Sequence, residues 1–308
     1  MDNTLNATYL IFDGHVEVDK YRYVYFFITL IVYILIICTN CTIVYLIWIH
    51  QNLHEPMYIF IAALLLNSVL FSTMIYPKLL IDFLSKIQVI SYSACLFQFY
   101  IFYSLGGSEF LLLAAMAYDR YVSICKPLQY ASIMRRTTVC IFLILAWTVP
   151  ACEVAVATGL IVKEKLCSFI LKGIFCNNVI YKLQCVISTA RIIRDMIILV
   201  NIALIPVLFI LFTYTRILII SYQSSREFRR KAAQTCLPHL IILINFFCLC
   251  SYDVVAVGLE SKFPKILQFI MSFQVILYHP LFNPIIYGLK MKEIFKHLKK
   301  LFCRRNIK

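Results

Sequence analysis

Seven long apolar stretches, separated by shorter polar segments, divide the chain. A helix needs roughly 20 consecutive apolar residues to cross the hydrocarbon core of a bilayer. The stretches that meet this length run over residues 24–49, 57–81, 95–123, 138–160, 195–220, 236–258 and 265–289. The pattern predicts an all-α membrane protein, a bundle of seven transmembrane helices whose two termini lie on opposite sides of the membrane.

A different pattern follows the last stretch. Apolar residues between Met291 and Phe302 recur at three- and four-residue spacing, with lysines between them. This spacing is typical of a basic amphipathic helix on a membrane surface. We therefore expect a single domain over residues 1–308. It would comprise a tail at 1–23, the bundle at 24–289, and a surface helix with a tail at 290–308.

Composition favours a membrane location. Hydrophobic residues make up 62% of the 308 residues and charged residues 14%, and the mean hydropathy is +0.85. In soluble chains charged residues approach about a quarter of the total. The first 23 residues carry four acids and lack the basic start and short apolar core of a cleavable signal peptide. The first span is thus expected to direct insertion.

The distribution of basic residues predicts the orientation. If the end of the third span near Arg120 faces the cytoplasm, 17 of the 29 lysines and arginines lie inside, as the positive-inside rule requires. Lys20 and Arg22 oppose this assignment locally, but the later loops outweigh them. We expect a plasma-membrane protein with an extracellular N-terminus. The net charge of +14 then indicates contact with membrane lipid headgroups and no nucleic acid partner.

The most distinctive sequence lies at the inner end of the third span. Residues 116–130 read MAYDRYVSICKPLQY. Arg120 keeps its proton in proteins, so at the edge of an apolar bundle it requires a carboxylate or water. Asp119 is the nearest acid. The segment resembles the MAYDRYVAICxPLxY signature of vertebrate odorant receptors, a branch of the rhodopsin-like G-protein-coupled receptors.

Four further segments resemble the same family, so that the likeness covers nearly the whole chain. They are LHEPMY at 53–58, YPKLL at 76–80, KAAQTCLPHL at 231–240 and PLFNPIIYG at 280–288. The first is the spelling of the family's LHxPMY box that is associated with fish-type receptors, and the last matches PxxNPxxYG in full. The FYG that usually follows the third of these boxes reads Phe247-Cys248 here, a departure typical of divergent members.

The resemblance implies how such a protein is activated. An arginine held by acidic and polar groups at rest is released and meets the G protein when the sixth helix moves outward. Pro284 removes one helical hydrogen bond and Asn283 is expected to repair the gap, which makes a soft joint. The residues to which the family assigns activation and G-protein coupling are Asp119, Arg120, Tyr121, Tyr214, Asn283, Pro284 and Tyr287.

The ligand implied by the family is a small, largely apolar odorant with one polar group, which Tyr103, Ser251 or Asp253 would meet. The seventh span has no lysine for a retinal Schiff base, and Phe102 stands where amine receptors carry an aspartate. Core packing explains any single one of the lining residues as well. The lining would comprise Phe99, Phe102, Tyr103, Gly106, Gly107, Cys250, Ser251, Asp253, Val254, Phe273 and Ile276.

Four cysteines lie on the predicted outer side, in an oxidising compartment, and four cysteines allow three pairings. A zinc site would lack histidines at ligand spacing. The resemblance implies the pairs Cys95–Cys176 and Cys167–Cys185, and it implies neither a metal nor a cofactor. Asn6-Ala7-Thr8 is a glycosylation sequon in the extracellular tail.

Glu109 matches a glutamate that odorant receptors carry in the third helix. An ionisable group at that depth is costly and hence a functional candidate. The family often places an aspartate twelve residues after Pro56, where this chain has Ser68. Two interpretations stay open for Glu109, a cation ligand and a protonated or hydrogen-bonded structural acid.

Together these features predict an odorant receptor that activates an olfactory-type stimulatory G protein and raises cyclic AMP, in the cilia of olfactory neurons. A rhodopsin-like receptor for another small ligand is the alternative. A transporter or channel would show repeated halves or aligned polar residues through the spans. An intramembrane enzyme would carry a paired catalytic motif. The sequence shows neither feature.

The orientation can be tested with epitope tags. An N-terminal tag should bind antibody on intact cells, whereas a C-terminal tag should bind only after permeabilisation, because the positive-inside bias places residues 290–308 in the cytoplasm. Staining of the C-terminal tag on intact cells would contradict the seven-span topology.

Overall fold

The computed structural model describes residues 9–186, 188–222, 225–259 and 264–303. Within these ranges it does not describe the side chains of residues 228–229, 231–235, 238, 249, 252–259 and 302–303. Asn6 of the predicted sequon therefore lies outside the described residues, as do the side chains of Asp253 and Val254.

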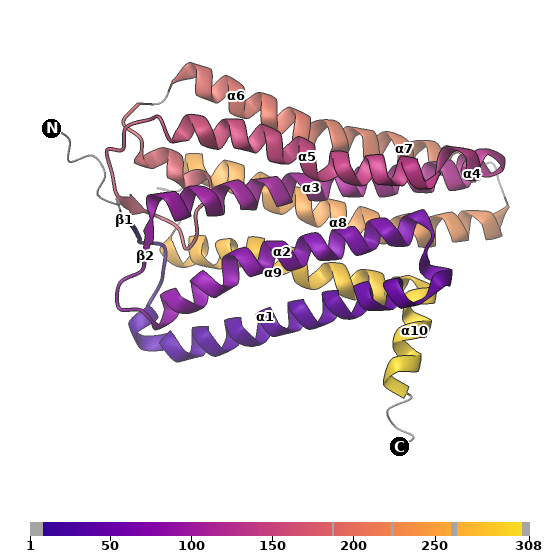
Figure 1. Cartoon of the computed structure of the whole chain (residues 1–308), viewed down its shortest axis with the longest axis horizontal. Helices are drawn as coiled ribbons and strands as arrows, with labels where there is room; N and C mark the ends of the chain where they lie inside the picture. The colour runs from indigo at the N-terminus through magenta and orange to yellow at the C-terminus, as the bar shows by residue number, and fades with distance from the viewer. Residues whose placement is uncertain (1–8, 187, 223–224, 260–263, 304–308) are drawn as a thin grey trace.

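Long helices run alongside one another and form a bundle (Figure 1). Each of the seven predicted spans corresponds to one helical rod, so the predicted fold class is confirmed. The rods are α1 (Val18–Ile49), α2 (Pro56–Leu84), α3 (Tyr92–Cys125), α5 (Arg136–Ile161), the run α6 (Thr189–Leu199) to η4 (Val200–Leu204) to α7 (Ile205–Tyr222), α8 (Arg226–Leu259) and α9 (Lys265–Lys290).

Six of these rods are long and apolar enough to cross a membrane in the part of the chain that the structure describes. The remaining rod, α8, which is sixth in chain order, has a polar beginning and contains the shorter apolar stretch His239–Cys248. Short elements connect the rods at the end that the sequence predicts to be cytoplasmic (the inner end, opposite the outer end): η1 (Gln51–Leu53), η2 (Pro127–Gln129) and α4 (Tyr130–Ile133).

The fifth rod begins earlier than its hydropathy predicts. The expected start was residue 195, but the Ser188 side chain caps a helix that begins at Thr189, where its hydroxyl accepts a hydrogen bond from the Arg191 backbone N–H at 3.2 Å. The rod then passes through the π-helical turn η4 just before Pro206. Arg191 and Arg194 consequently stand on a helix instead of in a loop.

The amphipathic segment forms α10 (Lys292–Cys303), which leaves the bundle at the end opposite to β1 (Figure 1). Its Ile294 is buried against the bundle, whereas Phe295 and Leu301 are exposed. The His297 ring packs on His50 after α1, and its Nε2 lies 3.2 Å from Asn52 Nδ2. A helix with one docked face and one apolar exposed face suits a membrane surface.

A small sheet at the outer end of the bundle was not predicted. The strand β1 (Tyr9–Phe12) lies between β2 (Val89–Ser91) and β3 (Ile170–Leu171). It pairs antiparallel with β2, Tyr9 opposite Ser91, and parallel with β3, Ile11 opposite Ile170. Beside the sheet, η3 (Asn178–Leu183) completes the outer layer.

Two disulfides secure that layer. Cys95 in the first turn of α3 is bonded to Cys176, and Cys167 is bonded to Cys185. These are the pairings that the family resemblance implies. The Cys176 backbone N–H also donates to Gln98 Oε1 at 2.9 Å. The segment between α5 and α6 is thereby fixed over the outer end of α3.

Removing the disulfide between α3 and this segment should destabilise the folded protein. For Cys95→Ser we expect a loss of about 2–5 kcal/mol, because the cross-link closes a long loop of the unfolded chain. Surface expression and thermal unfolding in detergent would measure the loss. Cys140→Ser, at an exposed free cysteine in α5, is the matched control and should leave both quantities unchanged.

Candidate functional site

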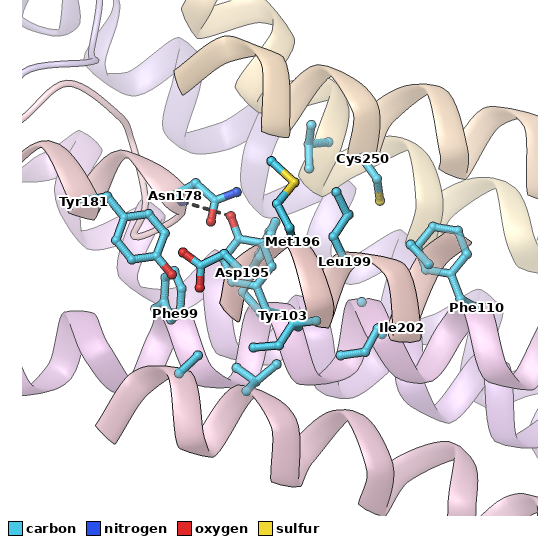
Figure 2. A pocket seen from close by; sticks show the side chains of 18 of the residues that line it. Phe99, Tyr103, Phe110, Asn178, Tyr181, Asp195, Met196, Leu199, Ile202 and Cys250 are labelled. Atoms are coloured by element: carbon cyan, nitrogen blue, oxygen red, sulfur yellow. Dashed lines mark hydrogen bonds between the residues drawn. The ribbon is translucent and has the colours of Figure 1, made fainter. Parts of the chain in front are cut away.

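A cavity of about 560 Å³ lies between α3, α5, the α6–η4 run, α8 and α9 (Figure 2). Its size and its largely apolar wall are those of a small-molecule site. The lining consists mainly of aromatic and aliphatic side chains, among them Phe71, Phe99, Phe102, Phe110, Val154, Leu199, Ile202 and Phe246.

The α3 part of the predicted lining faces this cavity. All five α3 residues named from the sequence line it, and Cys250 of α8 lines it as well. The five belong to one face of the helix because they are spaced by three, four or one residues. They are Phe99, Phe102, Tyr103, Gly106 and Gly107.

Three predicted lining residues lie elsewhere. The Ser251 hydroxyl donates to the Phe247 carbonyl of its own helix at 2.7 Å, and Ser251 is not among the lining residues. Phe273 stacks on Phe83 with ring centroids 6.1 Å apart. Ile276 is fully buried in the same outer cluster between α2 and α9. None of the three lines this cavity.

The rotation of α9 about its axis explains the error in that helix. Val275 and His279, four residues apart and so one turn from each other, line the cavity instead. Phe273 and Ile276 point their side chains toward α2 because the aromatic cluster there encloses them. The rotation of a helix inside a bundle depends on its neighbours, and the apolar pattern of this span does not specify it.

The fifth rod supplies a wall that the sequence analysis missed. Asp195, Met196, Leu199 and Ile202 line the cavity from α6 and η4, and Figure 2 shows them opposite the α3 side chains. All four lie within the predicted fifth span, and their spacing of three and four residues is a helical face that the sequence already offered.

The outer end of the cavity is polar and its charges are paired. Arg191 Nη1 contacts Glu164 Oε2 at 3.0 Å and also bonds Gln184. Its guanidinium lies over the Tyr181 ring, 4.9 Å from the centroid. Arg194 Nη2 contacts Asp195 Oδ1 at 2.8 Å. Ion pairs thus engage Arg191 and Asp195, two of the charged side chains that line this end of the cavity; Lys182 lines it as well.

Two features of the outer layer support this wall. The Tyr103 hydroxyl accepts a hydrogen bond from the Asn178 backbone N–H at 2.9 Å (Figure 2), so a predicted ligand contact is engaged with η3. Burial, together with the neighbouring Asp195 carboxylate, raises the pKa of Tyr181 above its ordinary value. The Tyr181 phenol therefore stays neutral at physiological pH.

Below the cavity lies a buried polar cluster. Asn283 Nδ2 donates to Glu109 Oε1 at 3.1 Å and lies 3.4 Å from the Ser68 hydroxyl. The second Glu109 oxygen contacts His279 Nε2. The described residues contain no group of three His, Cys, Asp or Glu side chains placed to hold a metal ion. The contacts favour a hydrogen-bonded Glu109 over a cation ligand.

The proline joint of α9 is repaired differently from the prediction. Pro284 cannot donate to the Pro280 carbonyl, and Asn40 of α1 takes that place with an Nδ2–O distance of 2.9 Å. Asn283 was expected to fill this gap, but its amide is used in the cluster with Glu109. The joint therefore depends on a neighbouring helix.

At the inner end, Arg120 is held by Asp119. Arg120 Nη2 lies 2.6 Å from Asp119 Oδ2, and the Tyr130 hydroxyl donates to the other carboxylate oxygen at 2.8 Å. Asp119 is fully buried. A charge buried in this way requires both partners. The tyrosine after α3 is a contact that the sequence analysis did not include.

Two tyrosines that the family assigns to activation stand near the ion pair of Arg120 with Asp119, called the Arg120 latch. The Tyr287 hydroxyl is fully buried and lies 3.3 Å from His239 Nδ1. Tyr214 is also buried, and its hydroxyl has no hydrogen-bond partner among the described residues. Tyr121, further along α3, is half-buried and stacks with Tyr118.

The fold places the chain in a class of membrane proteins. Squid rhodopsin has the same fold, with a TM-score of 0.73 over 94% of this chain and 82% of that chain, at 18% sequence identity. The protein is thus a multi-pass membrane protein with the seven-helix fold of rhodopsin-like G-protein-coupled receptors.

Sequence comparison identifies the family. Residues 29–305 match the family described as "Olfactory receptor". Human olfactory receptor 10AG1 is 36% identical over 94% of this chain and 97% of its own length, and human olfactory receptor 6K3 is 31% identical over 99% and 92%. The chain belongs to the olfactory receptor family, which is not enzymatic. The assignment to fish-type receptors, which rests on the spelling of residues 53–58, stays a prediction.

Two adjacent glycines of α3 allow a test of the packing around the cavity. A Cβ at Gly107 would lie 2.5 Å from Ile202 Cγ2 and 2.8 Å from Pro150 Cβ, whereas a Cβ at Gly106 would meet nothing within 4 Å. Gly107→Ala should destabilise the protein by about 1–3 kcal/mol through overpacking. Gly106→Ala, the control, should be neutral or slightly stabilising because alanine favours helices. Equal thermal unfolding of the two variants would contradict this packing.

Proposed function

We propose that the protein is an odorant receptor. It binds a small, largely apolar odorant in the cavity between α3, α5, α6, α8 and α9, and it then activates a heterotrimeric G protein of the olfactory stimulatory type, which raises cyclic AMP. The observation that carries this proposal is the apolar cavity of about 560 Å³ in a chain of the olfactory receptor family.

The ligand contacts proposed from the sequence are retained for α3 and extended to the fifth rod. Phe99, Phe102 and the two glycines leave an apolar surface with a gap beside Gly106, where an added methyl group would have no atom within 4 Å. Leu199 and Ile202 form the facing wall. Because the charged groups at the outer end are paired with one another, the ligand's free energy of binding comes mainly from burial of apolar surface.

We further propose that the sheet and the disulfides face the extracellular side, at the plasma membrane of olfactory neuron cilia. Two disulfides beside the N-terminal strand suit an oxidising compartment. The opposite end carries the Arg120 latch, the exposed Leu128 and the lysines of α10. This end would meet the G protein and the anionic inner leaflet.

Activation is proposed as a shift between two populations. An odorant that prefers the state with α8 displaced outward moves the equilibrium by its difference in affinity for the two states and by no more. In that state Arg120 leaves Asp119, and Tyr214 and Tyr287 change partners near it. The Tyr214 hydroxyl, which has no partner among the described residues, supports this role, because a buried polar group without a partner gains free energy when it finds one.

Arg120→Ala should abolish odorant-evoked cyclic AMP in cells that contain the olfactory-type G protein, and it should leave surface expression unchanged.

Tyr130→Phe should raise basal cyclic AMP, since Asp119 loses a hydrogen bond worth on the order of 1.5–3 kcal/mol in the latched state. Arg136→Ala, at an exposed arginine on the same end, is the control. An odorant-driven ion current without any G protein would contradict the proposed function.

A further inference from the structure

His279 belongs to two sites at once. Its side chain lines the outer cavity, and its Nε2 contacts the carboxyl group of Glu109. The other oxygen of Glu109 accepts the hydrogen bond from Asn283, the residue before the proline joint. His279 therefore connects the floor of the proposed odorant site to the buried polar cluster. No family motif quoted from the sequence includes it.

The imidazole of His279 is enclosed by aromatic rings that also line the cavity. The Phe246 ring centroid lies 4.9 Å away and the Phe71 ring stacks at 5.7 Å. The side chain is 4% exposed. Its Nδ1 atom is buried and has no hydrogen-bond partner among the described residues.

The other polar groups near the cavity are already engaged. The Tyr103 hydroxyl accepts from Asn178, Asp195 is paired with Arg194, and Ser251 bonds to its own helix. A buried polar atom without a partner costs free energy, and a ligand that supplies the partner recovers it. Nδ1 of His279 is hence the polar atom that a ligand can satisfy.

The contact with Glu109 decides which chemistry Nδ1 offers. Two states of the pair leave no net charge in the membrane interior: a neutral carboxylic acid donating to a neutral imidazole, and a carboxylate beside an imidazolium. In both states Nδ1 carries a hydrogen. A neutral acid with its proton on Oε1 would weaken the hydrogen bond that this oxygen accepts from Asn283. A carboxylate beside a neutral imidazole that donates from Nε2 places an uncompensated charge in the bundle and is costly. Nδ1 is thus a hydrogen-bond donor.

We propose that His279 is the polar anchor of the odorant site, and that its Nδ1–H donates to an acceptor oxygen of an otherwise apolar ligand. Aldehydes, ketones and esters have such an oxygen. Hydrocarbons have none, and a protonated amine offers only donors and a charge. This inference rests on the proposed function and specifies its ligand class.

The anchor also gives the ligand a route to the joint in α9. Because Nδ1 is buried although the side chain lines the cavity, a ligand oxygen reaches it only when the imidazole shifts toward the cavity. The shift weakens the contact between Nε2 and Glu109 and so releases the partner of Asn283. A ligand that lacks the oxygen fills the cavity without this effect, and binds with less activation.

The test compares compounds of equal chain length that differ in one group. Aldehydes, ketones and esters of about six to ten carbons, sizes suited to such a cavity, are applied beside the hydrocarbons and primary amines of the same carbon number. Cyclic AMP dose-response curves and surface expression are measured in cells with the olfactory-type G protein. For the wild type, the best oxygen-bearing agonist should be roughly tenfold or more as potent as its hydrocarbon analogue, the effect of one hydrogen bond.

Two variants separate the nitrogen atoms of the ring. His279→Asn retains an N–H close to the position of Nδ1 and should keep the preference for oxygen-bearing ligands. His279→Gln extends its amide toward Glu109 in place of Nε2 and leaves no donor at Nδ1, so the preference should disappear. A role in packing alone would affect both variants alike and would not change the ratio of potencies.

The possible failures are distinguishable. Equal potency of hydrocarbons or amines in the wild type overturns the inference, and this result requires no variant to fold. A preference that survives in surface-expressed His279→Gln overturns it as well. A wild-type receptor that reaches the surface and raises no cyclic AMP with any odorant of any class overturns the proposed function instead.

Discussion

Lipid offers no hydrogen bonds, so a polar group inside the bundle requires a partner in the protein or costs free energy until it finds one. Asn40 meets this requirement for the Pro280 carbonyl that Pro284 leaves open. Asn67 does so between helices, since it donates to the Leu105 carbonyl of α3 and accepts from the Trp147 indole of α5. These bonds specify which helices are neighbours and how each helix is rotated about its own axis. The apolar surfaces that face lipid specify neither the neighbours nor the rotation.

The same constraint makes the bundle suitable for switching. Glu109, His279, Asn283 and Ser68 form one chain of contacts from the cavity floor to the joint, and Asp119 with its two partners forms another at the inner end. Any change of partner in either cluster must be matched by a new partner, because an orphaned group in this environment is expensive. Two discrete arrangements are therefore favoured over a continuous range.

Much of the fold could be predicted from residues that act locally. The length of each apolar stretch predicts a span, the basic residues near Arg120 predict the orientation, and Pro284 predicts a joint in its helix. Each of these effects involves only residues close together in the sequence. Features that depend on packing could not be predicted: the rotation of α9, which replaces Phe273 and Ile276 by Val275 and His279 at the cavity, and the choice of Asn40 as the repair of the proline gap. The strands β1 and β3, of four and two residues, are too short to show a period. The five residues predicted on α3 line the cavity, whereas the facing residues of the fifth rod were not predicted, because the sequence does not show which side of that helix meets α3.

The parallel pairing of β1 with β3 has a consequence for biosynthesis. Ile11 leaves the ribosome long before Ile170, and four membrane helices are made between them. The tail therefore has to wait, without its second neighbour, until the segment after α5 has been synthesised. The parallel pair is completed late although its first strand is made first, and β1 presents one unpaired edge during that interval.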